Sequence, residues 1–293
     1  MEYILQQSIN ALGWGSVMAL LGAGYTMTFG IIGLVNFAHG EVLMAGAVAA
    51  YVAMTLLGLP FWAGVIASIL GAVAVGVIVE RTCFKPVRNV GMITLFIVSL
   101  GASIILRNLA ILTFGDQLKT FAVPEYFSGI FTIGNLYIFK KNIIVFALTV
   151  VIGVSLATFV RKTKFGVAMR SVSYDSALSQ AMGINTERII VFTFILSSFL
   201  CGVSAVFWGL LYGSVSSSMG VEAVVAAFIV SVVGGIGNIN GALASGYILG
   251  IGGALFVAFL PPDLVGLRPL FLWVVFFLIL FFKPSGLFRA NIK

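Results

Sequence analysis

Residues that could line a solute path cluster where the first long apolar segment of the chain is interrupted. Residues 30–41 read GIIGLVNFAHGE, and the single histidine of the chain lies within them. Ionisable groups between membrane-length segments are costly and usually face a cavity or a pathway. This stretch therefore predicts a solute path or its gate. Its candidate residues are Gly30, Gly33, Asn36, His39 and Glu41.

Helix capping offers a simpler explanation of the same residues. Asn36 is a good N-cap for the following helix, because its side chain can accept a hydrogen bond from the amide of Ala38 or His39. Glu41 would then lie near the positive end of that helix, where a carboxylate is favoured. The depth of the segment in the membrane decides between the two explanations.

A second glycine-rich stretch repeats the first. Residues 234–240 (GGIGNIN) match residues 30–36 (GIIGLVN) at four of seven positions. Paired Gly-interrupted segments in two halves of a chain point to the central site of a transporter, and chance similarity between two glycine-rich turns is the alternative. The corresponding path candidates are Gly234, Gly237 and Asn240. Glu222, which opens the short apolar segment before them, is either an interfacial acid at a helix start or part of the outer mouth.

The composition sets the class of protein. Hydrophobic residues make up 61% and charged residues 9% of the 293 residues, and the mean hydropathy is +1.17. Such values predict an all-α, polytopic integral membrane bundle, with about 8–10 transmembrane helices and Gly-interrupted or re-entrant segments near residues 30–40 and 234–241. We treat residues 1–293 as one transmembrane domain in contact with membrane lipid. The apolar windows lie at about residues 4–29, 38–57, 61–79, 92–112, 143–160, 189–211, 222–233, 242–260 and 267–282.

The net charge of +7 follows membrane topology rather than a nucleic-acid partner. Eleven of the 16 Lys and Arg residues fall in two loops and the C-terminal tail, all on one side if nine spans alternate. The positive-inside rule places that side in the cytoplasm. We therefore expect the N-terminus outside and the C-terminus inside.

The longest basic loop, residues 161–188, is about three times the usual length of a connection between bundle helices. Ser173 is expected to cap a short helix with Asp175 in its first turn, and Gly183 is expected to end it. A capped helix on the cytoplasmic side, with Arg170 and Asp175 at its start, would offer a docking surface, whereas a plain connecting loop is the alternative.

Catalytic and cofactor motifs are missing from the sequence. There is no HExxH, GxSxG or CxxC motif, and the two cysteines, Cys83 and Cys201, lie in apolar contexts. No GxxxxGK[ST] phosphate loop is present, so ATP hydrolysis is not expected on this chain. We predict no cofactor and no metal site.

Four motifs together resemble one known family. The stretches 24–41 (GYTMTFGIIGLVNFAHGE), 80–88 (ERTCFKPVR), 165–185 (FGVAMRSVSYDSALSQAMGIN) and 232–250 (VVGGIGNINGALASGYILG) stand in the order found in permease subunits of bacterial ABC importers of the branched-chain amino acid (LivH-type) family. The likeness extends from about residue 12 to residue 286.

This resemblance implies a permease in the bacterial plasma (inner) membrane that imports branched-chain or other hydrophobic amino acids. It implies a related second permease, of LivM type, together with two cytoplasmic ATP-binding subunits and an extracytoplasmic solute-binding protein. It also implies that Gly166, Arg170, Asp175 and Gly183 lie in the segment that contacts the ATPases. Urea or short amides are alternative substrates within the family, and a secondary carrier or channel is the alternative outside it.

Overall fold

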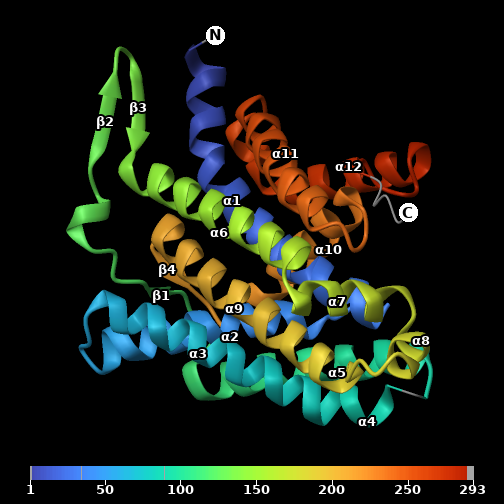
Figure 1. Cartoon of the computed structure of the whole chain (residues 1–293). Helices are drawn as coiled ribbons and strands as arrows, with labels where there is room; N and C mark the ends of the chain where they lie inside the picture. The colour runs from blue at the N-terminus through green and yellow to red at the C-terminus, as the bar shows by residue number, and fades with distance from the viewer. Residues whose placement is uncertain (1, 34, 89, 289–293) are drawn as a thin grey trace.

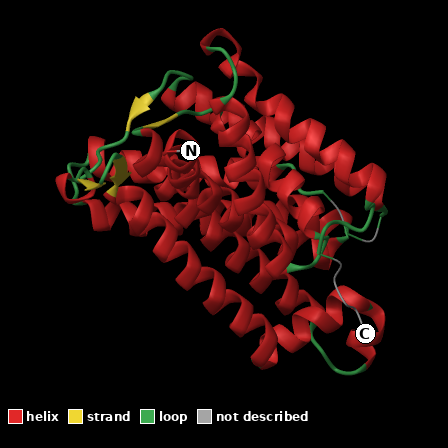
Figure 2. Ribbon diagram, turned by 90° about the horizontal axis from the view of Figure 1, so that it is seen from above, coloured by secondary structure: helices red, strands yellow, loops and turns green. Residues whose placement is uncertain are grey.

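The computed structural model describes residues 2–33, 35–88 and 90–288, and it is a helical bundle with a few short strands at one edge (Figures 1 and 2). The helices are α1 (Glu2–Ile32), α2 (Ala38–Tyr51), η1 (Val52–Leu56), α3 (Phe61–Val79), η2 (Glu80–Phe84), α4 (Lys85–Val87), α5 (Met92–Phe114), η3 (Glu125–Phe127), α6 (Lys140–Lys162), α7 (Lys164–Tyr174), α8 (Ser176–Ala181), α9 (Thr186–Tyr212), α10 (Met219–Gly234), α11 (Ile239–Ala258), η4 (Pro262–Leu267) and α12 (Arg268–Phe282). The strands are β1 (Lys119–Thr120), β2 (Ile130–Ile133), β3 (Leu136–Phe139) and β4 (Ser214–Val215).

Each apolar window of the sequence forms a helix. Within the described residues, seven helical segments are long and apolar enough to cross a membrane, and α10 and α12 are shorter apolar helices. The predicted all-α, polytopic fold is therefore confirmed.

Helix α1 forms the centre of the bundle. It packs against α6, α9, α10 and α11 (Figure 1), and 78% of its apolar window is buried. By contrast, only 22% of the α5 window is buried. Since hydrocarbon tails are as apolar as leucine, outer helices of a membrane bundle need no polar face, and α3, α5 and α6 expose mainly large apolar side chains.

The chain turns back into the bundle after α1. Gly33 has a φ of +75°, a conformation that glycine adopts without steric cost. Residues 35–37 then return along α1. This direction is shown by the Nε2 atom of His39, which lies 3.3 Å from the carbonyl oxygen of Leu21. Leu21 is roughly 16 Å from the end of α1, given the rise of an α-helix. Helix α2 therefore begins beside the middle of α1, which gives the predicted re-entrant form to this segment.

Two pairs of short strands lie at the end of the bundle that contains the α5 C-terminus. Strand β1 pairs antiparallel with β4, and β2 pairs with β3 in a hairpin (Figure 1). The side chain of Gln6 holds the hairpin to α1 by donating to the carbonyl oxygen of Tyr137 and accepting from its amide. The hydroxyl of Ser217 donates to the carbonyl of Gly115, which connects the entry of α10 to the end of α5.

Candidate translocation pathway and coupling segment

Glu41 is buried deep between α2 and α5. Its side chain is 0% exposed, and its Oε1 atom accepts a hydrogen bond of 3.1 Å from the hydroxyl of Ser103, near the midpoint of α5. Its Oε2 atom has no hydrogen-bond partner among the described residues. Ser103 and Arg107 lie one turn apart on the same face of α5. The carboxylate is thus far from either end of α5.

An apolar cleft extends from Glu41 along α2, α3 and α5. Its volume is about 700 Å³. Met44 and Val48 of α2 face Leu106 and Leu109 of α5 across it, and Phe114 lies at its far end, where α5 terminates. The cleft therefore extends from a buried carboxylate to the C-terminal end of α5.

Asn36 and His39 are enclosed by the chain itself. The Oδ1 atom of Asn36 accepts a hydrogen bond of 3.0 Å from the amide of Ala38, as the capping explanation predicts. The imidazole of His39 lies between α1 and α9, edge-on to the ring of Tyr25 and 3.3 Å from the sulfur of Cys201. These contacts fasten the start of α2 to the central helices, so both residues position the segment that carries Glu41.

The two glycine-rich stretches lie side by side. A β-carbon added to Gly30 would lie 3.2 Å from the α-carbon of Gly237. Gly33 and Gly237, which correspond in the sequence repeat, both have positive φ angles, +75° and +79°. Ser173 of α7 also reaches this point, donating a hydrogen bond to the carbonyl of Gly30. The repeat thus marks two similar chain reversals that meet at the C-terminal ends of α1 and α10.

The asparagines of the two stretches differ in structure. Asn238, rather than Asn240, caps the second stretch, because its side chain accepts from the amide of Gly241 at 3.1 Å. Asn240 is the second residue of α11 and is exposed. Gly234, the last residue of α10, lies against the backbone of Gly241 and Ala242 with no room for a side chain.

The start of α10 meets the start of α2. Gly40 lies against the carbonyl of Gly220 so closely that a β-carbon would overlap it, and Gly220 in turn lies beside the carboxylate of Glu41. Glu222 follows in the first turn of α10 and is exposed. Its exposed position, two residues after Gly220, is compatible with either prediction made for it.

The long basic loop contains two helices, α7 and α8, instead of the single helix expected. Ser173 does not begin a helix; it lies in the last turn of α7, whose N-cap is Thr163. Asp175 is the N-cap of α8 and accepts from the amide of Leu178 at 2.8 Å. The prediction that Ser173 caps the helix was wrong. Serine and aspartate both suit the N-cap position, and here Asp175 occupies it, whereas the hydroxyl of Ser173 bonds to Gly30.

Gly166 and Arg170 fasten α7 to the end of α6. A β-carbon on Gly166 would overlap the backbone of Val160, and the Arg170 guanidinium donates to the carbonyl of that same residue. A cation at a helix C-terminus is favoured by the free carbonyls and the helix dipole there. These two residues therefore set the angle between α6 and α7.

Gly183 ends α8 as expected. It has a φ of +86°, its amide donates to the carbonyl of Gln180, and the amide of Ile184 donates to the carbonyl of Ser179. This pair of bonds is the Schellman motif, which favours glycine at the left-handed position. Asn185 then caps α9 by accepting from the amide of Arg188.

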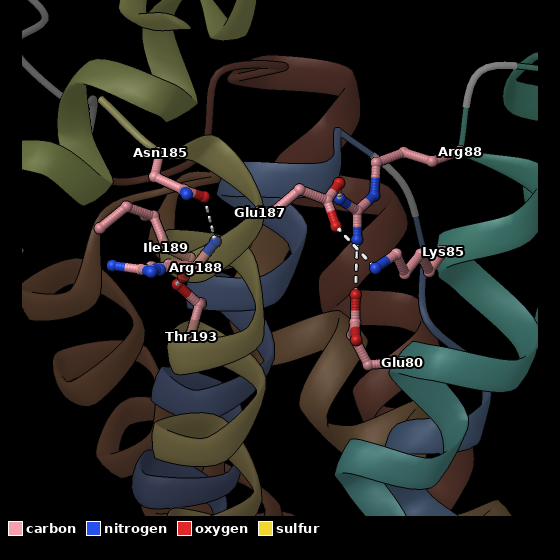
Figure 3. Close-up of polar contacts among 8 residues, drawn as sticks. All are labelled: Glu80, Lys85, Arg88, Asn185, Glu187, Arg188, Ile189 and Thr193. Atoms are coloured by element: carbon pink, nitrogen blue, oxygen red, sulfur yellow. Dashed lines mark hydrogen bonds and ion pairs between the residues drawn. The ribbon is translucent and has the colours of Figure 1, made fainter. Parts of the chain in front are cut away.

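A charged network links the start of α9 to the end of α3 (Figure 3). Arg88 lies between two glutamates, 2.5 Å from Glu80 and 2.5 Å from Glu187, and Lys85 is 3.4 Å from Glu187. Glu80 is completely buried and begins the π-helical turn η2. Because Glu187 follows α8 by only a few residues, the network joins the segment that contains α7 and α8 to the end of α3.

The sequence analysis did not identify Ser103, Gly220 or the Glu80–Arg88–Glu187 network. Ser103 and Arg107 are polar residues one turn apart in an apolar span, a signal that could have been used. Gly220 and Glu187 have no comparable local signal, since their partners are more than ninety residues away.

Comparison with known proteins identifies the family. Residues 7–282 match the model of the family described as branched-chain amino acid transport system / permease component. The chain is also 35% identical to the high-affinity branched-chain amino acid transport system permease protein LivH of Salmonella typhimurium, over 97% of this chain and 95% of that protein. The chain belongs to the branched-chain amino acid transport permease family.

Two further comparisons agree with this membership. BraD of Pseudomonas aeruginosa, a permease protein of the same description, is 34% identical over 97% of this permease and 95% of its own length. A metal-chelate type ABC transporter in an inward-facing conformation shares the fold, with a TM-score of 0.50 and 15% identity over 94% of this permease and 85% of that chain.

This permease is therefore a multi-pass membrane subunit of an ABC transporter and not an enzyme, as the four sequence motifs indicated. Among residues 2–33, 35–88 and 90–288, no group of three or more His, Cys, Asp and Glu side chains is placed to hold a metal ion.

Proposed function

We propose that this permease forms one half of the membrane pathway of an ATP-driven importer for branched-chain or other hydrophobic amino acids. The observation that carries the proposal is its match to that permease family over residues 7–282, together with the names of its relatives LivH and BraD. The second half would be a related, LivM-type permease. Two cytoplasmic ATP-binding subunits and an extracytoplasmic solute-binding protein would complete the complex.

In this proposal the protein lies in the bacterial plasma (inner) membrane, with its N-terminus outside and its C-terminus in the cytoplasm. The basic loops support this orientation through the positive-inside rule. Residues 161–188 would then lie in the cytoplasm, where the ATP-binding subunits are.

Helices α7 and α8 would be the docking segment for those subunits. Tyr174 ends α7, Leu178 lies in α8 and Met182 is the C-cap of α8; the three are 77%, 58% and 78% exposed. Exposed apolar side chains on the cytoplasmic side would therefore give a protein partner a surface to cover.

Movement of this segment would reach the pathway by two routes. One is the contact of Ser173 with Gly30, where the two glycine-rich reversals meet. The other is the charged network from Glu187 to Glu80. The pathway itself would be formed or gated by the residues predicted from sequence, namely Gly30, Gly33, Asn36, His39, Glu41, Glu222, Gly234, Gly237 and Asn240.

Reconstitution of the complete importer in proteoliposomes tests the proposal. Uptake of radiolabelled leucine should require the binding protein and ATP, and should exceed uptake of urea or acetamide. Leucine uptake driven by an ion gradient without the ATP-binding subunits would assign the chain to secondary carriers. Preferred uptake of urea would retain the ABC mechanism and change the substrate.

Substitutions in the docking segment test its coupling role. Asp175→Ala removes the α8 cap, and Asp175→Asn restores it without the charge, since asparagine caps equally well. We expect ATP hydrolysis to become uncoupled from uptake in Asp175→Ala and in Arg170→Ala, with normal membrane insertion, and coupling to return in Asp175→Asn. Normal coupled uptake in the Arg170→Ala, Asp175→Ala double variant would contradict the assignment.

A further inference from the structure

The carboxylate of Glu41 is incompletely satisfied in an apolar setting. It is 0% exposed, it receives one hydrogen bond from Ser103, and its second oxygen has no partner within the part of the chain that the structure describes. Burying a carboxylate without a counter-charge in direct contact costs several kcal/mol. An external cation that donates hydrogen bonds would offset this cost.

The surroundings of Glu41 restrict what that cation can be. The cleft beside it is lined by aliphatic side chains such as Met44, Val48, Leu106 and Leu109. Its volume of about 700 Å³ is within the range of small-molecule sites, about 300–1,000 Å³. A ligand that fills it must carry hydrocarbon next to its charge, which a simple inorganic cation does not.

Arg107 adds a charge of the opposite sign. It is half-buried and lies one helical turn after Ser103, the residue whose hydroxyl donates to Glu41. Arginine is well suited to bind a carboxylate, because its planar group presents several donors. A carboxylate that lines the apolar cleft thus has a guanidinium one helical turn from its hydrogen-bond donor, next in the chain to Leu106 of the cleft wall.

We propose that Glu41, Ser103 and Arg107 form a binding site for the zwitterionic head group of an amino acid, whose aliphatic side chain occupies the cleft between α2, α3 and α5. The ammonium group contacts Glu41, and the carboxylate group contacts Arg107. This inference rests on the proposed function and specifies the substrate class of its pathway.

The described conformation is an occluded form of this site. Gly220, at the start of α10, lies directly against the Glu41 carboxylate, and Gly40 lies against the Gly220 carbonyl. Separation of α10 from α2 at this glycine contact would uncover Glu41. Neither position has room for a β-carbon, so the two helices close tightly over the carboxylate.

Competition binding to the reconstituted complex, without the solute-binding protein, tests the site. Radiolabelled leucine is the probe, isoamylamine is a competitor that has only the ammonium group, and isocaproate is a competitor that has only the carboxylate. Glu41→Gln should weaken leucine binding by about tenfold to a hundredfold, as for loss of a charged hydrogen bond. In this variant isoamylamine should no longer compete, whereas isocaproate still should. Arg107→Gln should show the reverse: isocaproate no longer competes and isoamylamine still does.

Controls separate this role from a structural one. Glu41→Asp should restore part of the binding, and Glu125→Gln, at an exposed site in η3, should bind like the wild type. Equal loss of both competitors in Glu41→Gln would indicate a structural defect and overturn the site.

Two other outcomes have separate meanings. Unchanged leucine binding in Glu41→Gln and Arg107→Gln, with coupled leucine uptake by the wild type, would overturn the site while leaving the proposed function intact. A bound lipid retained in the cleft of those variants would then assign the cleft to an acyl chain. Failure of the wild type to take up leucine would overturn both the site and the proposed function.

Discussion

Glu41 and Glu80 are both completely buried glutamates within membrane-length helical segments, and each has one oxygen atom without a partner among the described residues. They differ in what neutralises them. Glu80 forms an ion pair of 2.5 Å with Arg88, which itself pairs with Glu187. Glu41 contacts only the neutral hydroxyl of Ser103 at hydrogen-bond distance. The first carboxylate is held within the chain's own network, whereas the second still has capacity to bind a cation.

On the binding site proposed above, this difference separates a structural carboxylate from one that binds a ligand. A buried charge that is paired and hydrogen-bonded makes the arrangement of its helices specific, and breaking such a pair is expensive. A buried charge left with a neutral partner adds no such specificity, so its presence in an apolar bundle points to a ligand. We therefore expect substitutions in the Glu80–Arg88 pair to lower mainly the stability of the protein. Substitutions of Glu41 should lower mainly transport.

The largest stability effect is expected at Arg88. Arg88→Ala leaves Glu80 buried without a counter-charge, and we expect the free energy of unfolding to fall by about 3–5 kcal/mol. Thermal denaturation of the purified complex in detergent measures this loss as a lower apparent Tm. The Glu80→Gln, Arg88→Ala double variant should regain much of the loss, because the buried charge is then gone; no recovery would show that Arg88 acts through other contacts.

A smaller loss is expected where α2 and α10 meet. Gly40→Ala places a methyl group against the Gly220 carbonyl, and overpacking of this kind costs about 1–3 kcal/mol. Gly101→Ala is the matched control in α5, since no atom lies within 4 Å of its added β-carbon. The control should be neutral or slightly stabilising, as alanine is the better helix former. Equal Tm values for both variants would contradict the close contact over Glu41.

Glu41→Gln should change stability by less than about 1 kcal/mol, because it removes a buried charge and keeps an acceptor for Ser103. The same variant should lose leucine binding, so stability and transport separate at this residue. Denaturation in detergent alongside uptake measures both quantities. A Tm decrease as large as that of Arg88→Ala would show that Glu41, like Glu80, is a structural residue.

Lys85 is expected to have the smallest effect. Its ion pair with Glu187 joins side chains that are 57% and 50% exposed, and exposed pairs contribute about 0–1 kcal/mol. Lys85→Ala should therefore leave Tm nearly unchanged, and the small change should disappear at high salt. A salt-independent loss comparable with that of Arg88→Ala would indicate that the whole network acts as a unit.

Local signals in the sequence predicted much of the fold. Apolar windows gave helices at each predicted span, and the glycines at 33, 183 and 237 have the left-handed conformations that turns and helix ends require. The hydrogen bond from the Ala38 amide to the Asn36 side chain was predicted, but Phe37 rather than Asn36 takes the N-cap position of α2. These features depend on neighbours within a few positions, so a single sequence contains the information.

Contacts between distant segments could not be predicted in the same way. Serine suits a cap, and the sequence therefore suggested that Ser173 begins a helix, but its hydroxyl instead reaches Gly30 from the end of α7. The Gly repeat indicated two similar reversals without indicating that Gly30 and Gly237 touch. Asn238, which was not singled out in the sequence, caps α11 by accepting from the amide of Gly241.

The sequence by itself determined that this protein is a polytopic helical membrane protein, because apolar length and a lack of charge leave helices as the way to satisfy the backbone in lipid. The sequence also placed the glycine interruptions and the long basic loop at residues 161–188. Only the tertiary structure decided which buried carboxylate is neutralised. Glu80 meets Arg88 and Glu41 meets Ser103 through the packing of separate helices, and local sequence does not encode which helices pack together.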